Sequence, residues 1–142
     1  MSKSNALETG ILGLIFNGTA IANIAVNATS SPLTNLYASL HTADPGDAGD
    51  QTTNETTYTS YARVAVARTS GGWTVTGDTA VPVATIIFPT CTEGTATETH
   101  FGIGTTPSGA GVLLYSGAIT PTLNVSTGIQ PQLGTGTTIT EG

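Results

Sequence analysis

The first apolar residues of the chain recur at helical spacing. They fall at positions i, i+4, i+7 and i+8, which form one face of a helix: Leu7, Ile11, Leu14 and Ile15. Asn5, followed three residues later by Glu8, is typical of a capping box at a helix start, and Asn17-Gly18 is typical of a helix end. The pattern therefore predicts a helix between these two signals.

A second, shorter helical turn is predicted directly after the first. Thr19 can cap residues 20–25, which carry two isoleucines in helical phase, before turn formers and Pro32 break the pattern. Residues 1–30 are therefore expected to form an N-terminal helical arm, which packs its apolar face on a sheet or on a neighbouring subunit.

From Leu36 onward the apolar period changes to two, the period of a strand with one buried face. Residues 36–42 and 61–68 show this alternation most clearly. Six further segments have strand-like composition between turn signals: 72–77, 80–88, 99–106, 111–119, 122–129 and 137–140. We therefore expect a mainly β protein, an antiparallel β-sandwich or barrel-like domain of about eight strands with a short N-terminal helical segment.

The length of 142 residues fits one domain with its own core. We expect a single β-rich domain over residues 1–142, with a β body over 34–142 and a long loop over 43–58.

Charge is scarce along the whole chain. Charged residues make up 8% of the sequence, and three basic residues face nine acidic ones, for a net charge of −6. Such a balance leaves almost nothing to neutralise phosphates or anionic lipid, so neither nucleic acid nor a membrane surface is an expected partner. No apolar run approaches the roughly 20 residues that cross a bilayer.

The long loop contains three aspartates, Asp44, Asp47 and Asp50. Their spacing of three does not fit a calcium loop, whose ligands alternate. Asp44-Pro45-Gly46 instead predicts a turn, because Asp bonds to following amides and Pro and Gly suit turn positions. Residues 50–60 show no apolar periodicity until Tyr58, so we expect an exposed and mobile arm of about 12 to 15 residues that contacts a partner.

The sequence predicts no catalytic, cofactor-binding or metal-binding residues. His41 and His100 lie at strand ends without a second ligand at useful spacing, Glu93 and Glu98 are interpreted as solubilising turn residues, and Cys91 as a packed, unreactive thiol. Four aromatic residues are expected in the core or at a subunit contact rather than on a ligand platform: Trp73, Phe88, Phe101 and Tyr115. We therefore expect a protein that is not an enzyme.

Several segments, in order, resemble a known family. The segments LYASLHTADPGDAG, TYTSYARVAVARTSGGWTV, ATIIFPTCTEGTATETHFGIGTT and GVLLYSGAIT follow an N-terminal helix. This order closely resembles small virion proteins of tailed bacteriophages that are commonly labelled tail fibre proteins. LHTADPG, SYARVAV and THFGI are the most specific parts, and the resemblance covers nearly the whole chain.

The resemblance implies a structural bacteriophage protein, made in the bacterial host cytoplasm and incorporated in the virion. The sequence of a trimeric fibre normally shows repeats or long heptads, whereas this sequence predicts one compact Thr-rich β domain. We therefore expect a capsid decoration (cement) protein on the capsid surface, with the major capsid protein as partner. Because closed cyclic symmetry is common, we expect a homotrimer. The alternatives are a tail component (fibre, tip or tube protein) and a carbohydrate-binding receptor-recognition module.

Overall fold

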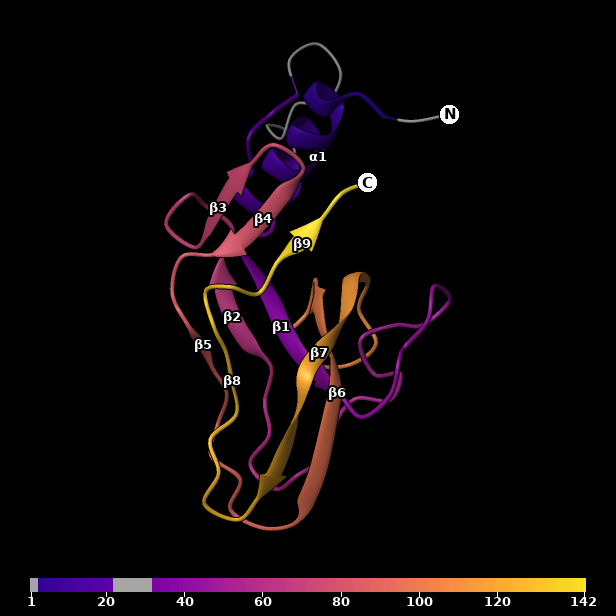
Figure 1. The fold of residues 1–142 in the computed structure, drawn as a ribbon, viewed down its shortest axis with the longest axis vertical. Coiled ribbons are helices and arrows are strands. Elements are labelled where there is room, and N and C mark those ends of the chain that lie inside the picture. Colours follow the sequence, from indigo (N-terminus) through magenta and orange to yellow (C-terminus); the bar gives the residue numbers. More distant parts are fainter. Residues whose placement is uncertain (1–2, 22–31) are drawn as a thin grey trace. The chain divides into compact units, whose positions relative to one another are not determined.

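A computed structural model describes residues 3–21 and 32–142 of the chain (Figure 1). Within these residues lie one helix and nine strands, so the mainly β class expected from the sequence is confirmed. The chain divides into two compact units, which are described one at a time. The first comprises Met1–Asn35, Ala67–Thr85 and Gly134–Gly142, and the second Leu36–Val66 and Ile86–Leu133. The single domain over residues 1–142 stays a prediction.

The helix of the first unit is α1, Asn5–Asn17. Its N-cap is Ser4 rather than the predicted Asn5, because Ser4 has extended backbone angles and its hydroxyl accepts from the Leu7 amide at 3.4 Å. The predicted end is confirmed, since Gly18 takes the left-handed conformation with φ 64°. The second predicted turn falls mostly on residues 22–31, outside the described residues.

The predicted apolar face of α1 is confirmed only in part, because Ile11, Leu14 and Ile15 are half-buried and the fully buried positions follow one residue later. Leu12 and Phe16 are the buried side chains, whereas Leu7 is 39% exposed. The ring of Phe16 packs edge-on against Trp73, with 4.7 Å between ring centroids. The buried face of α1 is therefore centred on Leu12 and Phe16, next to the stripe that simple periodicity selected.

The sheet of the first unit has the order β3-β4-β9. Its strands are β3 (Trp73–Thr76), β4 (Thr79–Pro82) and β9 (Ile139–Thr140). Both pairings are antiparallel, and Ile139 lies opposite Ala80 with both side chains buried. The strand predicted at 80–88 is divided, because β4 ends at Pro82 and Ile86–Ile87 form a separate short strand.

The larger sheet belongs to the second unit and has the order β2-β1-β6-β7. Its strands are β1 (Asn35–His41), β2 (Val64–Ala67), β6 (Thr95–Gly104) and β7 (Leu113–Ser126). The β1–β6 and β6–β7 pairings are antiparallel. Two segments predicted as separate strands, 111–119 and 122–129, combine in the single strand β7, although Pro121 interrupts its sequence.

A short antiparallel ribbon, β5 (Ile86–Ile87) with β8 (Gln132–Leu133), completes the second unit. The sequence did not indicate β8, which is only two residues long. Cys91 is buried in a cluster with Tyr58 and Val125, so its interpretation as a packed thiol is confirmed. Trp73, Phe88 and Phe101 are buried as expected, and Tyr115 is half-buried.

Candidate functional site at the loop after β1

The loop that follows β1, residues 42–57, folds back onto the strand that it leaves (Figure 1). The Thr42 amide donates to the Asn54 carbonyl at 2.9 Å, and the Thr56 amide donates to the Leu40 carbonyl at 3.0 Å. Gln51 and Thr56 are buried. The prediction of an exposed arm is therefore wrong for these two residues, because polar groups of the loop have partners on neighbouring elements. That the arm is mobile and contacts a partner stays a prediction.

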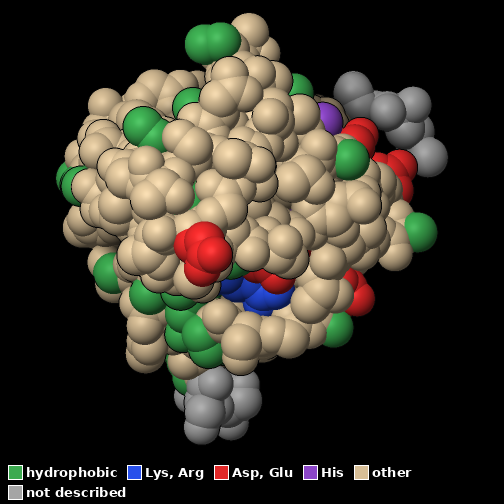
Figure 2. All heavy atoms as spheres, turned by 90° about the horizontal axis from the view of Figure 1, so that it is seen from below, with side chains coloured by type: hydrophobic (Ala, Val, Ile, Leu, Met, Phe, Trp, Pro, Cys, Tyr) green, Lys and Arg blue, Asp and Glu red, His purple; other side chains and the backbone are tan. Residues whose placement is uncertain are grey.

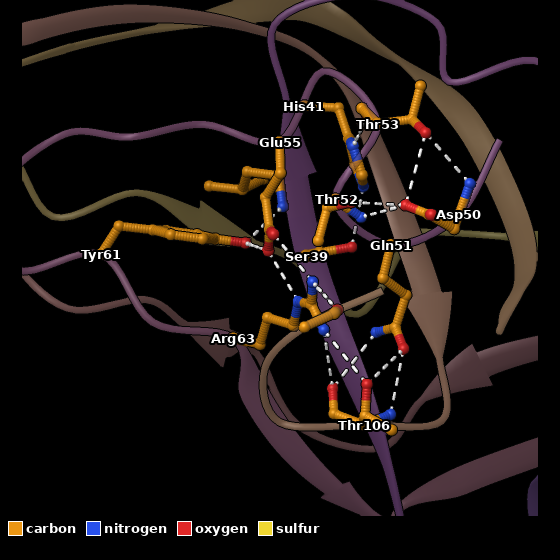
Figure 3. Close-up of polar contacts among 12 residues, drawn as sticks. Ser39, His41, Asp50, Gln51, Thr52, Thr53, Glu55, Tyr61, Arg63 and Thr106 are labelled. Atoms are coloured by element: carbon orange, nitrogen blue, oxygen red, sulfur yellow. Dashed lines mark hydrogen bonds and ion pairs between the residues drawn. The ribbon is translucent and has the colours of Figure 1, made fainter. Parts of the chain in front are cut away.

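The strongest of these contacts is a largely buried ion pair between Glu55 and Arg63 (Figure 3). Arg63 Nε donates to Glu55 Oε1 at 2.7 Å and Arg63 Nη2 donates to Oε2 at 2.8 Å, a bidentate geometry. The side chains are only 2% and 15% exposed for Arg63 and Glu55. Hydrogen bonding to Glu55 raises the pKa of Arg63. Arg63 therefore stays charged, and its ion pair with Glu55 holds the loop in place.

Tyr61 extends the ion pair toward β1. Its hydroxyl donates to Glu55 Oε1 at 2.8 Å and accepts from the Leu40 amide at 3.1 Å. Burial raises the pKa of Tyr61, so the phenol stays protonated and remains a donor.

Arg63 also reaches the hairpin between β6 and β7, residues 105–112. Its Nη1 donates to the Thr106 carbonyl at 3.0 Å, and its Nη2 donates to the Gly109 carbonyl at 2.8 Å. Thus one guanidinium connects the loop and the hairpin, and its donors bond to protein groups on both.

Gln51 joins the same two segments a second time (Figure 3). Its side-chain Oε1 accepts from the backbone amides of Thr105 and Thr106 at 2.9 and 3.0 Å, and its backbone amide donates to the Ala110 carbonyl at 2.9 Å. A Cβ on Gly104 would lie 2.1 Å from Gln51 Cδ, so only glycine leaves room for this side chain. The loop and the hairpin therefore form one fixed surface.

His41 lies fully buried at the start of the loop. Its Nδ1 is 2.8 Å from the Thr53 carbonyl and its Nε2 is 2.8 Å from Ser39 Oγ. A carbonyl only accepts, so Nδ1 carries the proton and Ser39 donates to Nε2. Burial lowers the pKa of His41, which favours this neutral form. The register of β1 and β6 places His41 opposite His100, the other candidate histidine.

Glu98 differs from its predicted role as a solubilising turn residue. It belongs to β6 and is completely buried, so that prediction is wrong. Its Oε1 accepts from Thr56 Oγ1 at 2.6 Å, and its Oε2 has no hydrogen-bond partner among the described residues. Burial raises the pKa of Glu98. Glu93, its supposed companion, lies exposed before β6, where its carbonyl accepts from the Thr59 amide at 3.0 Å.

The aspartates of the loop act as turn residues. Asp44 Oδ1 accepts from the Gly46 amide at 2.8 Å, which confirms the predicted turn, and Gly46 has φ 69°. Asp50 Oδ1 accepts from the Thr52 amide at 2.8 Å, and hydrogen bonds from Thr52 lower the pKa of Asp50. Within the described residues, no three His, Cys, Asp or Glu side chains are grouped so that they could hold a metal ion.

The three basic residues all have partners. Lys3 pairs with Glu141, Arg63 pairs with Glu55, and Arg68 donates to the Leu14 and Ile15 carbonyls near the end of α1. The face drawn in Figure 2 is mostly uncharged, and its basic atoms lie in a hollow beside acidic ones. No helix in residues 3–21 or 32–142 is long and apolar enough to cross a membrane.

Sequence reasoning missed Gln51, Glu55 and Arg63 as a connected group. The available signal was the scarcity of charge, since a charged residue beside an apolar strand in such a chain is expected to be paired. The partners themselves come from distant segments, which periodicity does not relate. The polar groups of these three residues hold the loop and the hairpin in place.

Comparison with known families assigns the chain. The model of a family described as podophage GP4 fiber I protein gp80 matches residues 2–140. A search of curated proteins found no match. The family match confirms the resemblance to phage virion proteins, over almost the whole length of the chain. The chain therefore belongs to the podophage GP4 fiber I protein gp80 family and is a phage structural protein of the fibre type.

Proposed function

We propose that this chain is a non-enzymatic building block of a podophage fibre. The observation that carries the proposal is the family match over residues 2–140, whose description names a fibre protein. This is the tail-component alternative of the sequence interpretation.

The site geometry supports a structural role. The loop and the hairpin are held together by hydrogen bonds of three side chains. Arg63 donates to Glu55 in the loop and to a backbone carbonyl of the hairpin, and Gln51 accepts from a backbone amide of the hairpin. Fixed loops beside a sheet suit a subunit that must present the same surface in every copy of an assembly, because little ordering is needed on contact.

Capsid decoration is the second candidate function. The observation that favours it is the size of the elements, since α1 has 13 residues and the longest described strand 14. Neither is the extended heptad helix of a coiled-coil shaft. In this role the chain would bind the major capsid protein on the capsid surface, as a homotrimer at local three-folds.

The carbohydrate-binding alternative has less support. All eight aromatic side chains of the sequence lie in the described residues, and each is buried or half-buried. An exposed aromatic platform for sugar rings is therefore not among the described surfaces.

Copy number separates the two candidates. Quantitative mass spectrometry of purified virions, calibrated against the major capsid protein, measures it directly. A fibre predicts a number far below that of the major capsid protein, whereas decoration predicts a comparable number. Absence of the protein from purified virions would contradict both roles.

A further inference from the structure

His41 combines burial with a direct contact to the loop. The ring is 0% exposed, and its Nδ1 donates to the Thr53 carbonyl at 2.8 Å. Gly102 leaves the space for it, because a Cβ there would lie 2.8 Å from His41 Nε2. A titratable group thus sits underneath the returning part of the loop, residues 50–57, without taking part in the ion pair of Glu55 and Arg63.

We propose that His41 is an acid-sensitive switch, whose protonation loosens residues 50–57 from β1 and β6. In the neutral ring Nε2 accepts from Ser39 Oγ at 2.8 Å. A proton on Nε2 turns this acceptor into a donor, so the Ser39 hydroxyl must rotate. The ring then carries a charge without contact with water, which favours an opened loop in which the imidazolium is hydrated.

The polar and charged groups around His41 act in both directions. The hydrogen bond to the Thr53 carbonyl and the charge of Glu55 favour an imidazolium, whereas Arg63 and, when charged, His100 on β6 repel it. Glu55 already accepts two hydrogen bonds from Arg63 and one from Tyr61. Burial has the largest effect and lowers the pKa of His41, in agreement with the proposed direction.

Glu98 contacts the same loop through Thr56 and titrates with the opposite sign. Its pKa is raised by burial, so acid favours the closed loop at this contact. A fair test therefore compares proteins that all retain Glu98 and differ only at a histidine.

Amide hydrogen exchange provides the readout. It is followed at Gln51, Thr53 and Thr56, whose amides are donors in the closed loop. Exchange is measured at pH 7 and pH 5.5 and corrected for the intrinsic pH dependence. With an ordinary histidine pKa of 6.5 in the opened loop and a lowered pKa in the closed loop, the opening constant of the parent should rise, by at most about eightfold. His41→Gln should show no such rise, and the matched variant His100→Gln should keep most of it.

An equal rise in His41→Gln and the parent would overturn the proposal, as would a rise lost only in His100→Gln. If His41→Gln does not fold, histidine titration of the parent by NMR decides. We expect the His41 ring and the Thr53 amide to titrate together below pH 6.5. A Thr53 amide that does not respond, or a His41 midpoint at or above the ordinary value, would contradict the switch.

Discussion

The two units of the chain stabilise their parts by different means. In the first, α1 buries Leu12 and Phe16, and the ring of Phe16 packs on Trp73 of β3. In the second, the loop at 42–57 depends on Gln51, Glu55 and other polar side chains with distant partners. Apolar contacts tolerate exchange for side chains of similar size, whereas a buried polar network requires each donor and acceptor. The same chain therefore contains one region that is robust to conservative change and one that is not.

The largest effect is expected in the apolar region. Phe16→Ala removes an aromatic ring that is 0% exposed, which should lower the free energy of unfolding of the first unit by about 3–5 kcal/mol. Trp73, the only tryptophan, reports on this unit by its fluorescence in a urea titration. Leu7→Ala on the same helix is the matched control and should cost well under half as much, because Leu7 is 39% exposed. Equal losses would show that α1 does not pack through Phe16.

The ion pair of the second unit should come next. Arg63→Met leaves Glu55 without its bidentate partner, at an expected cost of about 3 kcal/mol. Urea unfolding followed by circular dichroism measures it. Arg68→Met removes the other arginine, which bonds to helix carbonyls, and should cost about 1 kcal/mol. A larger loss for Arg68→Met than for Arg63→Met would reverse the ranking of these contacts.

Gln51 tests the polar region without a change of charge. Gln51→Ala leaves the amides of Thr105 and Thr106 without their acceptor, and the loss should be about 2 kcal/mol. The exposed residue Gln130 provides the control, since Gln130→Ala should be nearly neutral. If Gln51→Ala lowers the melting temperature but amide exchange in residues 105–112 does not become faster, this would argue against a direct contact of Gln51 with the hairpin.

Glu98→Gln should stabilise the protein at neutral pH. The folded pKa of Glu98 lies above its ordinary value of 4.5, so its protonated form contributes stability that is present below pH 4.5 and is lost as the pH rises through the folded pKa. A neutral glutamine retains an acceptor for Thr56 and avoids this loss. The melting temperature of the variant should therefore exceed that of the parent at pH 7, and the difference should shrink toward pH 4.5. A variant that is less stable at pH 7 would show that the carboxylate is stabilised by its surroundings.

The smallest effect is expected from the three loop aspartates. Joint replacement of Asp44, Asp47 and Asp50 by Asn keeps acceptors for the Gly46 and Thr52 amides. The melting temperature should change little, and a chelator should not affect the parent. A large drop on adding chelator would indicate an ion bound in this loop.

The sequence predicted the elements whose period is visible locally. The alternation of apolar and polar residues predicted β1 and the segment that contains β2, and Asn17-Gly18 predicted the end of α1. Periodicity located the buried face of α1 only in part, since the fully buried positions are Leu12 and Phe16. It also could not show that 111–119 and 122–129 belong to one strand, since Pro121 is a breaker in sequence but lies at the edge of this sheet.

The candidate site was less predictable for a related reason. Residues 51–57 look like a solvated loop, because Thr, Asn and Glu carry no apolar period. Their partners Arg63, Glu98 and Thr106 come from other segments, and only the folded chain brings them together. The turn at Asp44 was predictable, since its hydrogen bond spans only two residues.

Amide hydrogen exchange of the unmodified protein at pH 7 tests most directly whether the polar contacts fix the loop. The amides of Gln51 and Thr56 donate to the carbonyls of Ala110 and Leu40, so they should be protected to the same degree as amides of β1 and β6. If both amides exchange at the rate of an unstructured peptide while the strands stay protected, the loop is not fixed by these contacts, and the mobile arm predicted from the sequence is supported.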